Sequence, residues 1–479
     1  MLDILQIRLS NFLNSCENFF LPFKLQFSSK GLDYPITIQW HLTTKCQNNC
    51  KHCYMYDPQT YYREKERTLT LRQKIEILNQ LDEFGRKYGF AFKHFSLIGG
   101  DPLLADDVFD FIKVLRKRSK IVSLVGNPET LTDENCKKLK RYGIRYFNLS
   151  LDGMEKTHDL IRGQGSFKRT IDGIKQLDKY GIHSTTMITL SSLNVADFFD
   201  VLDYVFYKTK SKGIVFDFCV NIGNAKEIKS TITPETALDI ANRYLDKKKN
   251  YKNKRPDFNF GEKSGLLRLL HIYRKDTAFY ENETTGFTAG CLIGCGCQSI
   301  LSDGTLLLCR RLPEILGRLP EEKFENIFLS NEIIKKFRRP QFFEDCGKCI
   351  GWNWCRGCPG ISNGEYGNPY KKPSICYANF LETNHEYHTS RESISMQTTL
   401  AEEAKLIKRN TKHRYYESRY KQNISYKVLK TINKLKKSNE ANAFIENPKK
   451  WFAKNAGAHN SVEKNFIVYH FNAKIRGYE

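Results

Sequence analysis

The sequence lacks several features that define other classes of protein. No run of 18 or more apolar residues occurs in its 479 residues, which excludes a conventional membrane-spanning helix. The first 20 residues contain acidic and basic side chains and no small-residue cleavage site, so they do not resemble a signal peptide. Internal repeats and low-complexity tracts are also missing. We therefore expect a cytoplasmic globular protein.

The composition indicates a folded, basic protein. Hydrophobic residues make up 40% of the chain and aromatic residues 13%, which is enough to bury a core and excludes a largely disordered chain. This length predicts about three domains, or one large barrel with attachments. The formal net charge of +23 favours acidic partners such as nucleic acid, anionic lipid or acidic peptide, and it says nothing about the fold.

Cysteine is the most informative residue type. A cytosolic chain of this size neither favours nor needs a disulfide framework, so its 15 cysteines indicate metal ligation or redox chemistry. Three lie within residues 46–53, nine fall within residues 291–376, and three are isolated. The isolated ones, Cys16, Cys136 and Cys219, are expected to be buried as small apolar side chains.

Between the two cysteine clusters, short apolar or β-branched runs alternate with helical segments. The helix after Thr70, a candidate N-cap, carries Leu71, Ile75, Leu78 and Leu81 on one face. Six strand–helix units in series predict an α/β fold, a partial (β/α)6 TIM-like barrel with right-handed crossovers. The six predicted strands cover residues 36–43, 93–99, 121–126, 145–151, 183–190 and 213–221.

Shifts in composition predict the domain boundaries. We expect an N-terminal segment at 1–35, the partial barrel at 36–229, a charged helical connector at 230–287, a Cys-rich domain at 288–380 and a basic, mainly helical C-terminal extension at 381–479. The Cys-rich domain shows little periodicity, so we expect bound metal rather than an apolar core to order it. The extension has 19 Lys and Arg against 10 Asp and Glu, a net charge of +9.

The first cysteine cluster forms a Cys-x3-Cys-x2-Cys motif just after the first predicted strand. In a βα barrel this is the edge of the sheet where active sites form. Thiolates bind iron–sulfur clusters well, and three of them leave one iron of a four-iron cluster open for another ligand. The motif of Cys46, Cys50 and Cys53 resembles that of the radical S-adenosylmethionine (radical SAM) superfamily. A three-cysteine zinc site is the alternative.

This resemblance implies a reaction. In that family the open iron of a 4Fe–4S cluster holds SAM, and the reduced cluster donates the electron that cleaves it. The resulting 5′-deoxyadenosyl radical abstracts hydrogen from the substrate. Cys46, Cys50 and Cys53 would then be the catalytic cluster ligands.

A second motif follows the second predicted strand. The run Gly99-Gly100-Asp101-Pro102 resembles the family turn that holds the SAM amino group. Glycines let the backbone approach the ligand, and an acidic residue there would face an ammonium group. Asp101 departs from the glutamate that is more common in the family. Taken alone, such a run is also typical of an ordinary turn.

Residues around later strands extend the resemblance over about residues 36–225. Asn127 occupies the place of a family Thr-Asn-Gly-like turn. Ser150, in a stretch that resembles SxDG…HDxxRG, would bind the SAM ribose, and the fork of Arg162 would bind its carboxylate. A surface ion pair is the alternative for Arg162. His52 and Tyr54 flank the last ligand, where they would pack against the adenine or simply against the protein.

The second cysteine cluster resembles a SPASM domain, which carries two auxiliary 4Fe–4S clusters. By resemblance, one cluster would be held by Cys291, Cys297, Cys309 and Cys358. The other would be held by Cys346, Cys349, Cys355 and Cys376.

Two features of this array depart from the family pattern or stay open. The family usually has three residues between the last two closely spaced cysteines, whereas Cys355 and Cys358 have two, which puts ligation by Cys358 in doubt. Cys295 is left over, as a substitute ligand or a free thiol. A pair of zinc ribbons is the alternative for the whole array.

Family members with two auxiliary clusters mostly modify ribosomally made peptides or protein side chains. An auxiliary cluster can accept the second electron of an oxidation, which favours a crosslink or thioether product over an isomerisation. The resemblance thus implies an oxidoreductase of ribosomal peptide maturation, with SAM, three 4Fe–4S clusters and an external flavodoxin-like or ferredoxin-like electron donor. A membrane or nucleic-acid partner is not expected.

Two basic features suggest how a peptide is recognised. Arg310, followed by Arg311, stands where the sulfatase-maturing branch typically has an acidic residue, which disfavours formylglycine formation. Near a substrate cavity they would suit an acidic peptide; otherwise they face solvent. The extension at 381–479, with aromatics from Tyr415 to Tyr426, would bind a leader peptide or a protein partner, or else pack on the barrel as a solvated helical face.

Two other functions stay open. One is a small-molecule dehydrogenase of the same superfamily. The other is a zinc-bearing nucleic-acid-binding protein, suggested by the charge and the Cys-x2-Cys pairs, although the basic residues are spread rather than gathered on one stretch. The colour and iron content of the anaerobically purified protein would separate iron–sulfur from zinc.

Overall fold

The chain divides into two compact units, which we describe separately. The computed structural model describes residues 27–28, 31–32, 34–88, 90–262, 265–273, 291, 293–294, 297–337, 340–349 and 355–383. In the smaller unit, the described residues include an antiparallel pair of short strands, β1 (Phe27–Ser28) and β2 (Gly31–Leu32). The larger unit, built from residues 35–272 and 289–383, contains both predicted cysteine sites.

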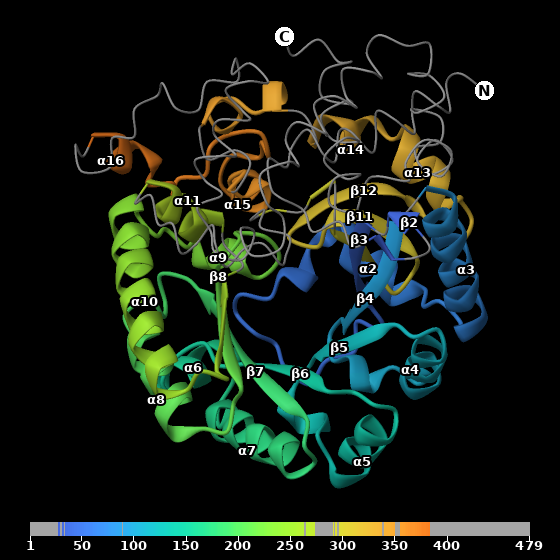
Figure 1. The fold of residues 1–479 in the computed structure, drawn as a ribbon, viewed down its shortest axis with the longest axis horizontal. Helices are drawn as coiled ribbons and strands as arrows, with labels where there is room; N and C mark the ends of the chain where they lie inside the picture. Colours follow the sequence, from blue (N-terminus) through green and yellow to red (C-terminus); the bar gives the residue numbers. More distant parts are fainter. Residues whose placement is uncertain are drawn as a thin grey trace, which may run out of the picture. The chain divides into compact units, whose positions relative to one another are not determined.

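A curved ten-stranded sheet organises the larger unit, and helices lie on its outer side (Figure 1). The strand order is β12-β11-β10-β3-β4-β5-β6-β7-β8-β9. The strands are β3 (Tyr34–His41), β4 (Phe90–Ile98), β5 (Ile121–Val125), β6 (Tyr146–Ser150), β7 (His183–Leu190), β8 (Gly213–Phe218), β9 (Asn259–Glu262), β10 (Cys297–Ile300), β11 (Thr305–Cys309) and β12 (Leu312–Arg318).

All six predicted strands are present, as β3 to β8, in the order that consecutive βα units produce. The pairs from β4 to β8 are parallel, and the helix that follows each strand returns the chain to the start of the next. The predicted partial TIM-like barrel is therefore confirmed. Because the strands are parallel, the loops that follow them lie at one edge of the sheet.

The helices of this unit fall between the strands and beyond them. Those of the barrel are α2 (Pro58–Glu66), α3 (Leu71–Tyr88), α4 (Val108–Lys117), α5 (Asp133–Arg141), α6 (Glu155–Arg162), α7 (Ser166–Lys179), α8 (Phe198–Lys208) and α9 (Ala225–Ile228). Those after it are α10 (Pro234–Lys254), α11 (Gly265–Tyr273), α13 (Phe324–Ser330), α14 (Glu332–Phe337), α15 (Pro359–Tyr366) and α16 (Ala378–Thr383). Short 3-10 helices are η1 (Tyr54–Tyr56), η2 (Pro102–Leu104), η3 (Pro128–Thr130), η5 (Pro340–Phe342) and η6 (Cys346–Lys348).

The main core lies between the sheet and its outer helices. Alternate residues of each strand point outward, so β7 alternates buried with half-buried positions along its length. Helix α3 begins as the sequence predicts, since the Thr70 hydroxyl accepts from the Gln73 backbone N–H and the Gln73 side chain accepts from the Thr70 N–H. Its buried face includes Leu78 and Leu81, as predicted.

The segment 230–287, predicted to be a helical connector, contains a strand as well as helices. Residues 259–262 form β9, which pairs in parallel with β8 and adds a seventh parallel strand to the barrel. The prediction of helix was wrong there. Gly261 allows the close approach, because a Cβ at that position would lie 2.8 Å from a Val215 methyl group.

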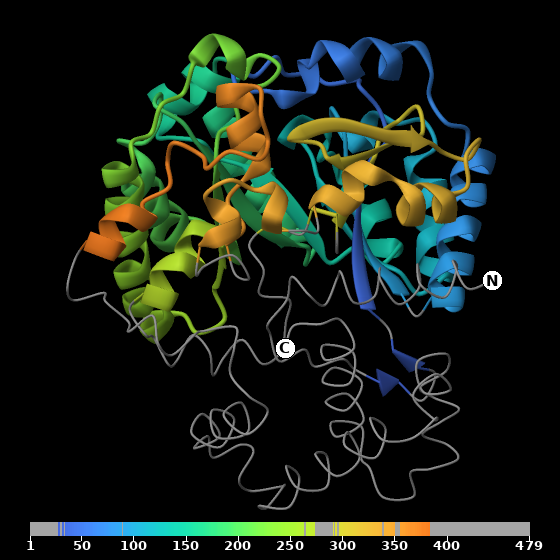
Figure 2. The ribbon, with the colours of Figure 1, turned by 90° about the horizontal axis from the view of Figure 1, so that it is seen from above.

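The Cys-rich segment extends one edge of the sheet and contacts helix α11, which follows the strand at the other edge (Figure 2). At one edge β10 pairs in parallel with β3, and β11 and β12 continue the sheet in antiparallel fashion. At the other edge the Tyr377 hydroxyl donates to the Leu266 carbonyl in α11. Residues 297–337 bury apolar side chains such as Leu306, Phe324 and Phe328. The prediction that metal alone orders this segment was therefore wrong for these residues.

Candidate active site

The three clustered cysteines lie on the loop between β3 and η1, at the edge of the sheet where the parallel strands end. Cys50 is buried and Cys46 and Cys53 are half-buried, and none of the three forms a disulfide. The loop is held by backbone bonds on two sides. Lys51 N–H donates to the Ile161 carbonyl in α6 at 3.0 Å, and Asn224 N–H donates to the Cys53 carbonyl at 3.0 Å.

Two of the three sulfurs receive hydrogen bonds from N–H groups of distant loops and helices. The side-chain amide of Asn127, after β5, donates to Cys46 Sγ at 3.2 Å. The guanidinium of Arg162, the last residue of α6, donates from Nη1 to Cys50 Sγ at 3.6 Å. Such bonds favour thiolate over thiol. They are the contacts that sulfur ligands of a metal cluster receive.

Burial opposes ionisation of these thiols while no metal is bound. It raises the pKa of Cys53 to about 12, and the nearby Cys50 and Cys46 thiols add to the rise. Burial also raises the pKa of Cys50, against the opposing charge of Arg162. A metal or cluster that binds here must displace the protons, so its binding is coupled to proton release.

The Gly99–Gly100 turn lies directly against the cysteine loop. Gly100 N–H donates to the Thr43 carbonyl, and Asp101 N–H donates to the Lys45 carbonyl, both at 2.8 Å. A Cβ at Gly100 would stand 2.1 Å from the Lys45 carbonyl oxygen, so a larger residue cannot fit there without displacing the loop. The glycines therefore allow close backbone packing against the cysteine loop, a role different from the predicted approach to a ligand.

The Asp101 side chain accepts hydrogen bonds from neighbouring residues. It is fully buried, and it accepts from the Thr130 hydroxyl at 2.8 Å and from the Leu103 N–H at 3.1 Å, which caps η2. Pro102 is the first residue of η2 and is also buried. Burial raises the pKa of Asp101 to about 6, although these bonds lower it. The expectation that this carboxylate faces an ammonium is therefore unsupported, since its bonds are local.

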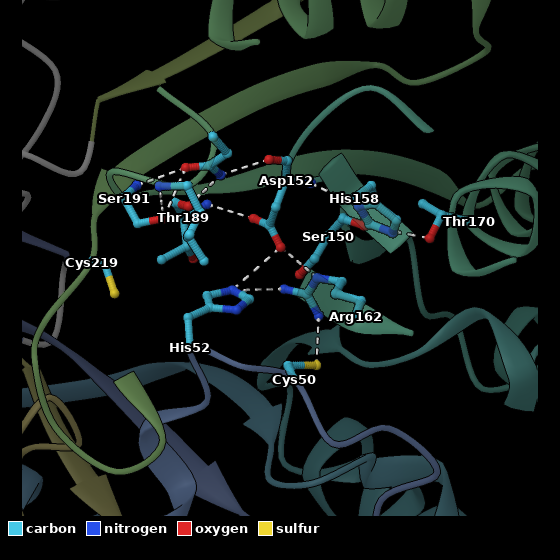
Figure 3. Close-up of polar contacts among 12 residues, drawn as sticks. Cys50, His52, Ser150, Asp152, His158, Arg162, Thr170, Thr189, Ser191 and Cys219 are labelled. Carbon is cyan, nitrogen blue, oxygen red and sulfur yellow. Dashed lines mark hydrogen bonds and ion pairs between the residues drawn. The ribbon is translucent and has the colours of Figure 1, made fainter. Parts of the chain in front are cut away.

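The stretch after β6 forms a buried polar network (Figure 3). The Asp152 carboxylate accepts from Thr189 N–H of β7 at 2.7 Å and from the Arg162 Nε, and it lies 3.3 Å from His52 Nε2. Arg162 thus pairs inside the protein rather than at the surface. Ser150, the last residue of β6, lies beside this network, and its carbonyl accepts from the Thr170 hydroxyl.

The aromatic residue after the last cysteine lies on the other side of the loop from this network. Tyr54 packs against His41 of β3, with ring centroids 6.3 Å apart, and under the guanidinium of Arg310 at 5.9 Å. Burial raises the pKa of Tyr54 to about 12. The structure therefore gives Tyr54 packing partners in β3 and in the Cys-rich segment, and His52 a polar partner in Asp152.

The later cysteines lie in two groups. Burial raises the pKa of Cys355 well above its ordinary value, and the thiols of Cys376, Cys346 and Cys349 add to the rise. These four therefore lie close enough for their charges to interact, and they are the second predicted ligand set.

The pKa shifts also group thiols of the first predicted auxiliary ligand set. Burial raises the pKa of Cys291 to about 12 against the charge of Arg356, and Cys358 and Cys309 add to the rise. Cys297 begins β10 and forms a β-bridge with Ile293, two residues after Cys291. The grouping supports a role for Cys358 despite the shortened spacing.

The thiols of these three groups are suited to iron–sulfur clusters by their donor chemistry. All eleven are free of disulfides, and at the first site N–H donors are already aimed at two sulfurs. Within the described residues, no three His, Cys, Asp or Glu side chains form a ready-made cage around a single metal ion. The fit therefore rests on the donor set and the grouping.

Arg310 and Arg311 do not face solvent. Arg310 is buried, and its Nη2 donates to Glu64 at 2.8 Å and to the Met55 carbonyl at 3.2 Å. Arg311 pairs with Asp217 at the end of β8, and its Nη2 donates to the Phe218 carbonyl at 2.6 Å. Both charges are neutralised within the protein. The hypothesis that these arginines attract an acidic peptide is therefore not supported, because each guanidinium already forms an ion pair within the protein.

Sequence reasoning missed several residues that hold the site. Asp152 stood in the SxDG-like run but received no role. Asn224 donates to the Cys50 carbonyl and Asn194 donates to the Asp152 carbonyl, and neither carried a local signal. Cys136 and Cys219 are buried as predicted. Cys16, Cys295 and the extension from Asn384 onward lie outside the described residues.

None of the helices in the described part of the chain has the length and apolar character required to cross a membrane.

Comparison with known proteins supports the interpretation of the site. Residues 40–205 match the sequence profile of the radical SAM superfamily. The AdoMet-dependent heme synthase of Methanosarcina barkeri is 26% identical over 351 residues, which cover 71% of this chain and 96% of the relative. The antilisterial bacteriocin subtilosin biosynthesis protein AlbA of Bacillus subtilis is 23% identical over 359 residues, which cover 73% and 72%.

Solved structures share the fold. Streptococcus suis SuiB bound to its precursor peptide SuiA has a TM-score of 0.55 and 17% identity, over 72% of this chain and 76% of SuiB. SuiB bound to S-adenosylmethionine has a TM-score of 0.56 and 16% identity, over 72% and 78%. Residues 40–205 are therefore similar to the radical SAM superfamily, and the fold of the chain resembles that of SuiB.

Proposed function

We propose that this enzyme cleaves S-adenosylmethionine at a cluster held by Cys46, Cys50 and Cys53 and uses the resulting radical to oxidise a peptide or protein side chain. The observation that carries the proposal is the loop between β3 and η1. It supplies three thiols at the edge where the parallel strands end, and a fourth protein ligand is absent from the motif. A three-thiol site leaves one iron open for the amino acid part of SAM.

The residues around the loop would position the cofactor. Gly99, Gly100, Asp101 and Pro102 would form the turn nearest the SAM amino group, by backbone carbonyls rather than by the buried Asp101 carboxylate. Asn127 fixes Cys46, and Ser150 and Tyr54 are proposed contacts to the nucleoside. The guanidinium of Arg162 would face the SAM carboxylate with the N–H groups that Asp152 and Cys50 leave free.

The Cys-rich segment would hold two auxiliary clusters, each with four protein ligands. The proposed sets are Cys291, Cys297, Cys309 and Cys358, and Cys346, Cys349, Cys355 and Cys376. Fully ligated clusters can carry electrons but cannot bind SAM. Together with a flavodoxin-like or ferredoxin-like donor, they would supply and remove the electrons of a net oxidation.

The chain's own groups then have three tasks. The loop's backbone bonds to Ile161 and Asn224 hold the ligands in place. Asp152 and Asn127 fix the donors that point at the ligand sulfurs. Arg311, paired to Asp217 at the end of β8, links the Cys309 region to the end of the barrel without leaving an unpaired buried charge.

A peptide substrate is favoured by two relatives. SuiB was solved with a precursor peptide, and AlbA is described as a bacteriocin biosynthesis protein. SuiB matches 72% of this chain and AlbA 73%. We therefore retain ribosomal peptide maturation, with a crosslink or thioether product, as the preferred function. The extension at 381–479 remains our proposed leader-peptide site.

A tetrapyrrole substrate is the second candidate. The M. barkeri heme synthase matches this chain over 96% of its own length, and a coproporphyrin synthase of the same organism is 24% identical over 379 residues. The two candidates differ in the charge that a site must accept, since a tetrapyrrole carries several carboxylates. Both arginines expected at the cavity are already paired, so neither offers a free charge to the carboxylates of a tetrapyrrole or of an acidic peptide.

One experiment separates the two substrates. The reconstituted enzyme is incubated anaerobically with SAM, reductant and either the short peptide encoded beside its gene or an iron coproporphyrin. A peptide that loses two hydrogen atoms by mass spectrometry, with wild type but not with Cys46→Ala, supports the proposal. Modification of the porphyrin with an unchanged peptide would replace it by the second candidate.

A further inference from the structure

Arg162 places a positive charge against one ligand of the proposed SAM-binding cluster. Its Nη1 lies 3.6 Å from Cys50 Sγ, and its side chain is mostly buried, with 14% of its surface exposed. Within the part of the chain that the structure describes, the donor to the other sulfur, Cys46 Sγ, is the neutral amide of Asn127. The two donors therefore differ in charge as well as in position.

Asp152 determines where this guanidinium lies. One carboxylate oxygen accepts from Arg162 Nε, and the other accepts from the Thr189 backbone N–H on β7 at 2.7 Å. The carboxylate is fully buried. Because β7 is an inner strand of the sheet, Asp152 connects Arg162 to one of the most rigid parts of the fold.

The backbone of Asp152 is fixed as well (Figure 3). Its N–H donates to His158 Nδ1 at 2.9 Å, and its carbonyl accepts from the Asn194 amide at 2.6 Å. Asn194 also donates to the Thr189 carbonyl at 2.9 Å. Hydrogen bonds therefore hold both the backbone and the side chain of Asp152 in place.

The helix that carries Arg162 is also held in place, because α6 is hydrogen-bonded to the cysteine loop. Lys51 N–H donates to the Ile161 carbonyl, one residue before Arg162. The guanidinium therefore cannot move away from Cys50 without breaking its bond to Asp152. His52 Nε2, 3.4 Å from Nη2 and 3.3 Å from the carboxylate, packs against the same pair.

From this arrangement we infer that Asp152 is a positioning residue that holds the Arg162 guanidinium against the Cys50 sulfur, and that the resulting charge and N–H bond raise the reduction potential of the SAM-binding cluster. The inference rests on the proposed function, because it needs a cluster on Cys46, Cys50 and Cys53.

The physical reason is electrostatic. Reduction adds one electron, and so a negative charge, to the cluster. A cation and an N–H donor at a ligand sulfur stabilise the reduced form more than the oxidised form. In a buried site with little water the effect is larger than at the surface. The neutral amide of Asn127 would contribute in the same direction but less.

The test is a redox titration of the holoenzyme, followed by the EPR signal of the reduced cluster that changes when SAM is added. That change separates the SAM-binding cluster from auxiliary ones. Arg162→Gln is expected to lower the ratio of reduced to oxidised cluster at a fixed potential by about tenfold, which for one electron is a shift of about 59 mV. Arg162→Lys keeps the charge but loses the fork, and is expected to lower the ratio less.

The Asp152→Asn variant distinguishes two effects of Asp152 on the cluster: its hold on the Arg162 guanidinium and its own negative charge. Removal of a negative charge near the cluster would by itself raise the potential. If Asp152 acts by holding Arg162, the potential instead falls, as in Arg162→Gln. A rise in Asp152→Asn overturns the positioning role. If Asp152→Asn does not load iron, the two Arg162 variants decide the matter alone, and unchanged potentials in both overturn the inference.

A matched control removes another ion pair of the same kind. Asp107 accepts from the buried Lys74 ammonium at 2.6 Å, and neither residue belongs to the site. Asp107→Asn is expected to leave the potential unchanged; an equal fall there would show a general loss of packing and overturn the inference. A wild-type enzyme with no SAM-sensitive signal would contradict the proposed function rather than this inference.

Discussion

Arg310 and Glu64 form a fully buried ion pair, with Nη2 and Oε2 2.8 Å apart. Arg310 follows Cys309 in the Cys-rich segment, and Glu64 lies on α2, just after the three-cysteine loop. The same guanidinium donates to the Met55 carbonyl in η1 and to the Thr60 hydroxyl. One side chain therefore ties the auxiliary segment to the structure that follows the first cysteine site.

Arg310→Met is expected to lower the free energy of unfolding by about 3–5 kcal/mol, because it leaves the Glu64 carboxylate buried without its partner. The double variant Arg310→Met/Glu64→Leu removes both charges and is expected to recover most of that loss. Urea unfolding of the single and double variants measures the difference. A double variant less stable than Arg310→Met would contradict this account of the pair.

Gly100→Ala is expected to disrupt the first cysteine site. Its Cβ would overlap the Lys45 carbonyl oxygen, which accepts from Asp101 N–H, so the cysteine loop must move. We expect at least a tenfold loss of SAM cleavage and a fall in iron content. Gly181→Ala is the control. No heavy atom lies within 4 Å of its Cβ, and its positive φ of 68° should cost only about 1–2 kcal/mol. Equal iron loss in both variants would contradict the steric explanation.

The buried Asp101 predicts a pH-dependent stability. Its pKa is about 6 in the folded protein, above an unfolded value of about 3.9. The folded state therefore holds the proton more tightly, and this contribution to stability is lost as the pH rises through about 6. Asp101→Asn cannot ionise, and its amide oxygen can still accept from Leu103 N–H while its NH2 group faces the Thr130 hydroxyl, which can accept as well as donate.

We expect the melting temperature of Asp101→Asn, relative to wild type, to rise between about pH 4 and about pH 6.5, from the unfolded to just above the folded pKa, and then level off. The full effect corresponds to about 2–3 kcal/mol for a pKa shift of about two units. Thermal unfolding of the two holoproteins across this range is the measurement. A difference that is constant with pH, or that falls as the pH rises, would contradict the raised pKa.

The grouping of the later cysteines predicts a pattern of iron loss. Cys355→Ala and Cys376→Ala are each expected to lose about four irons per chain, and the double variant no more than either single one. Cys355→Ala combined with Cys358→Ala affects both sets and is expected to lose about eight. Cys136→Ala, a buried cysteine of α5, is the control with no loss. Additive loss within the Cys355–Cys376 pair would contradict the grouping.

Local patterns predicted most of the fold and drew attention to the cysteines of the proposed site. The strands β3 to β8, the N-cap Thr70 and the Cys-x3-Cys-x2-Cys motif are each encoded by residues near one another in the sequence. Strand β9 was missed because Asn-Phe-Gly-Glu is too short to show an alternation and contains a glycine. Its position follows from pairing with β8, which a local pattern does not reveal.

The partners of the charged residues could not be predicted in this way. Arg310 and Glu64 are 246 positions apart, and Arg162 and Cys50 are 112 apart. Each pair exists only because the fold brings distant loops together at one edge of the sheet. A sequence shows that an arginine is present, but its burial and its partner determine whether the charge is available to a substrate.

The central claim is that three thiols hold a cluster on which S-adenosylmethionine is split. The most direct test is the release of 5′-deoxyadenosine from SAM under anaerobic, reducing conditions, by wild type and by the variant with Cys46, Cys50 and Cys53 all replaced by Ala. We predict steady release by wild type and none above background by the variant, with about four fewer irons per chain. Equal release by the two proteins would contradict the account.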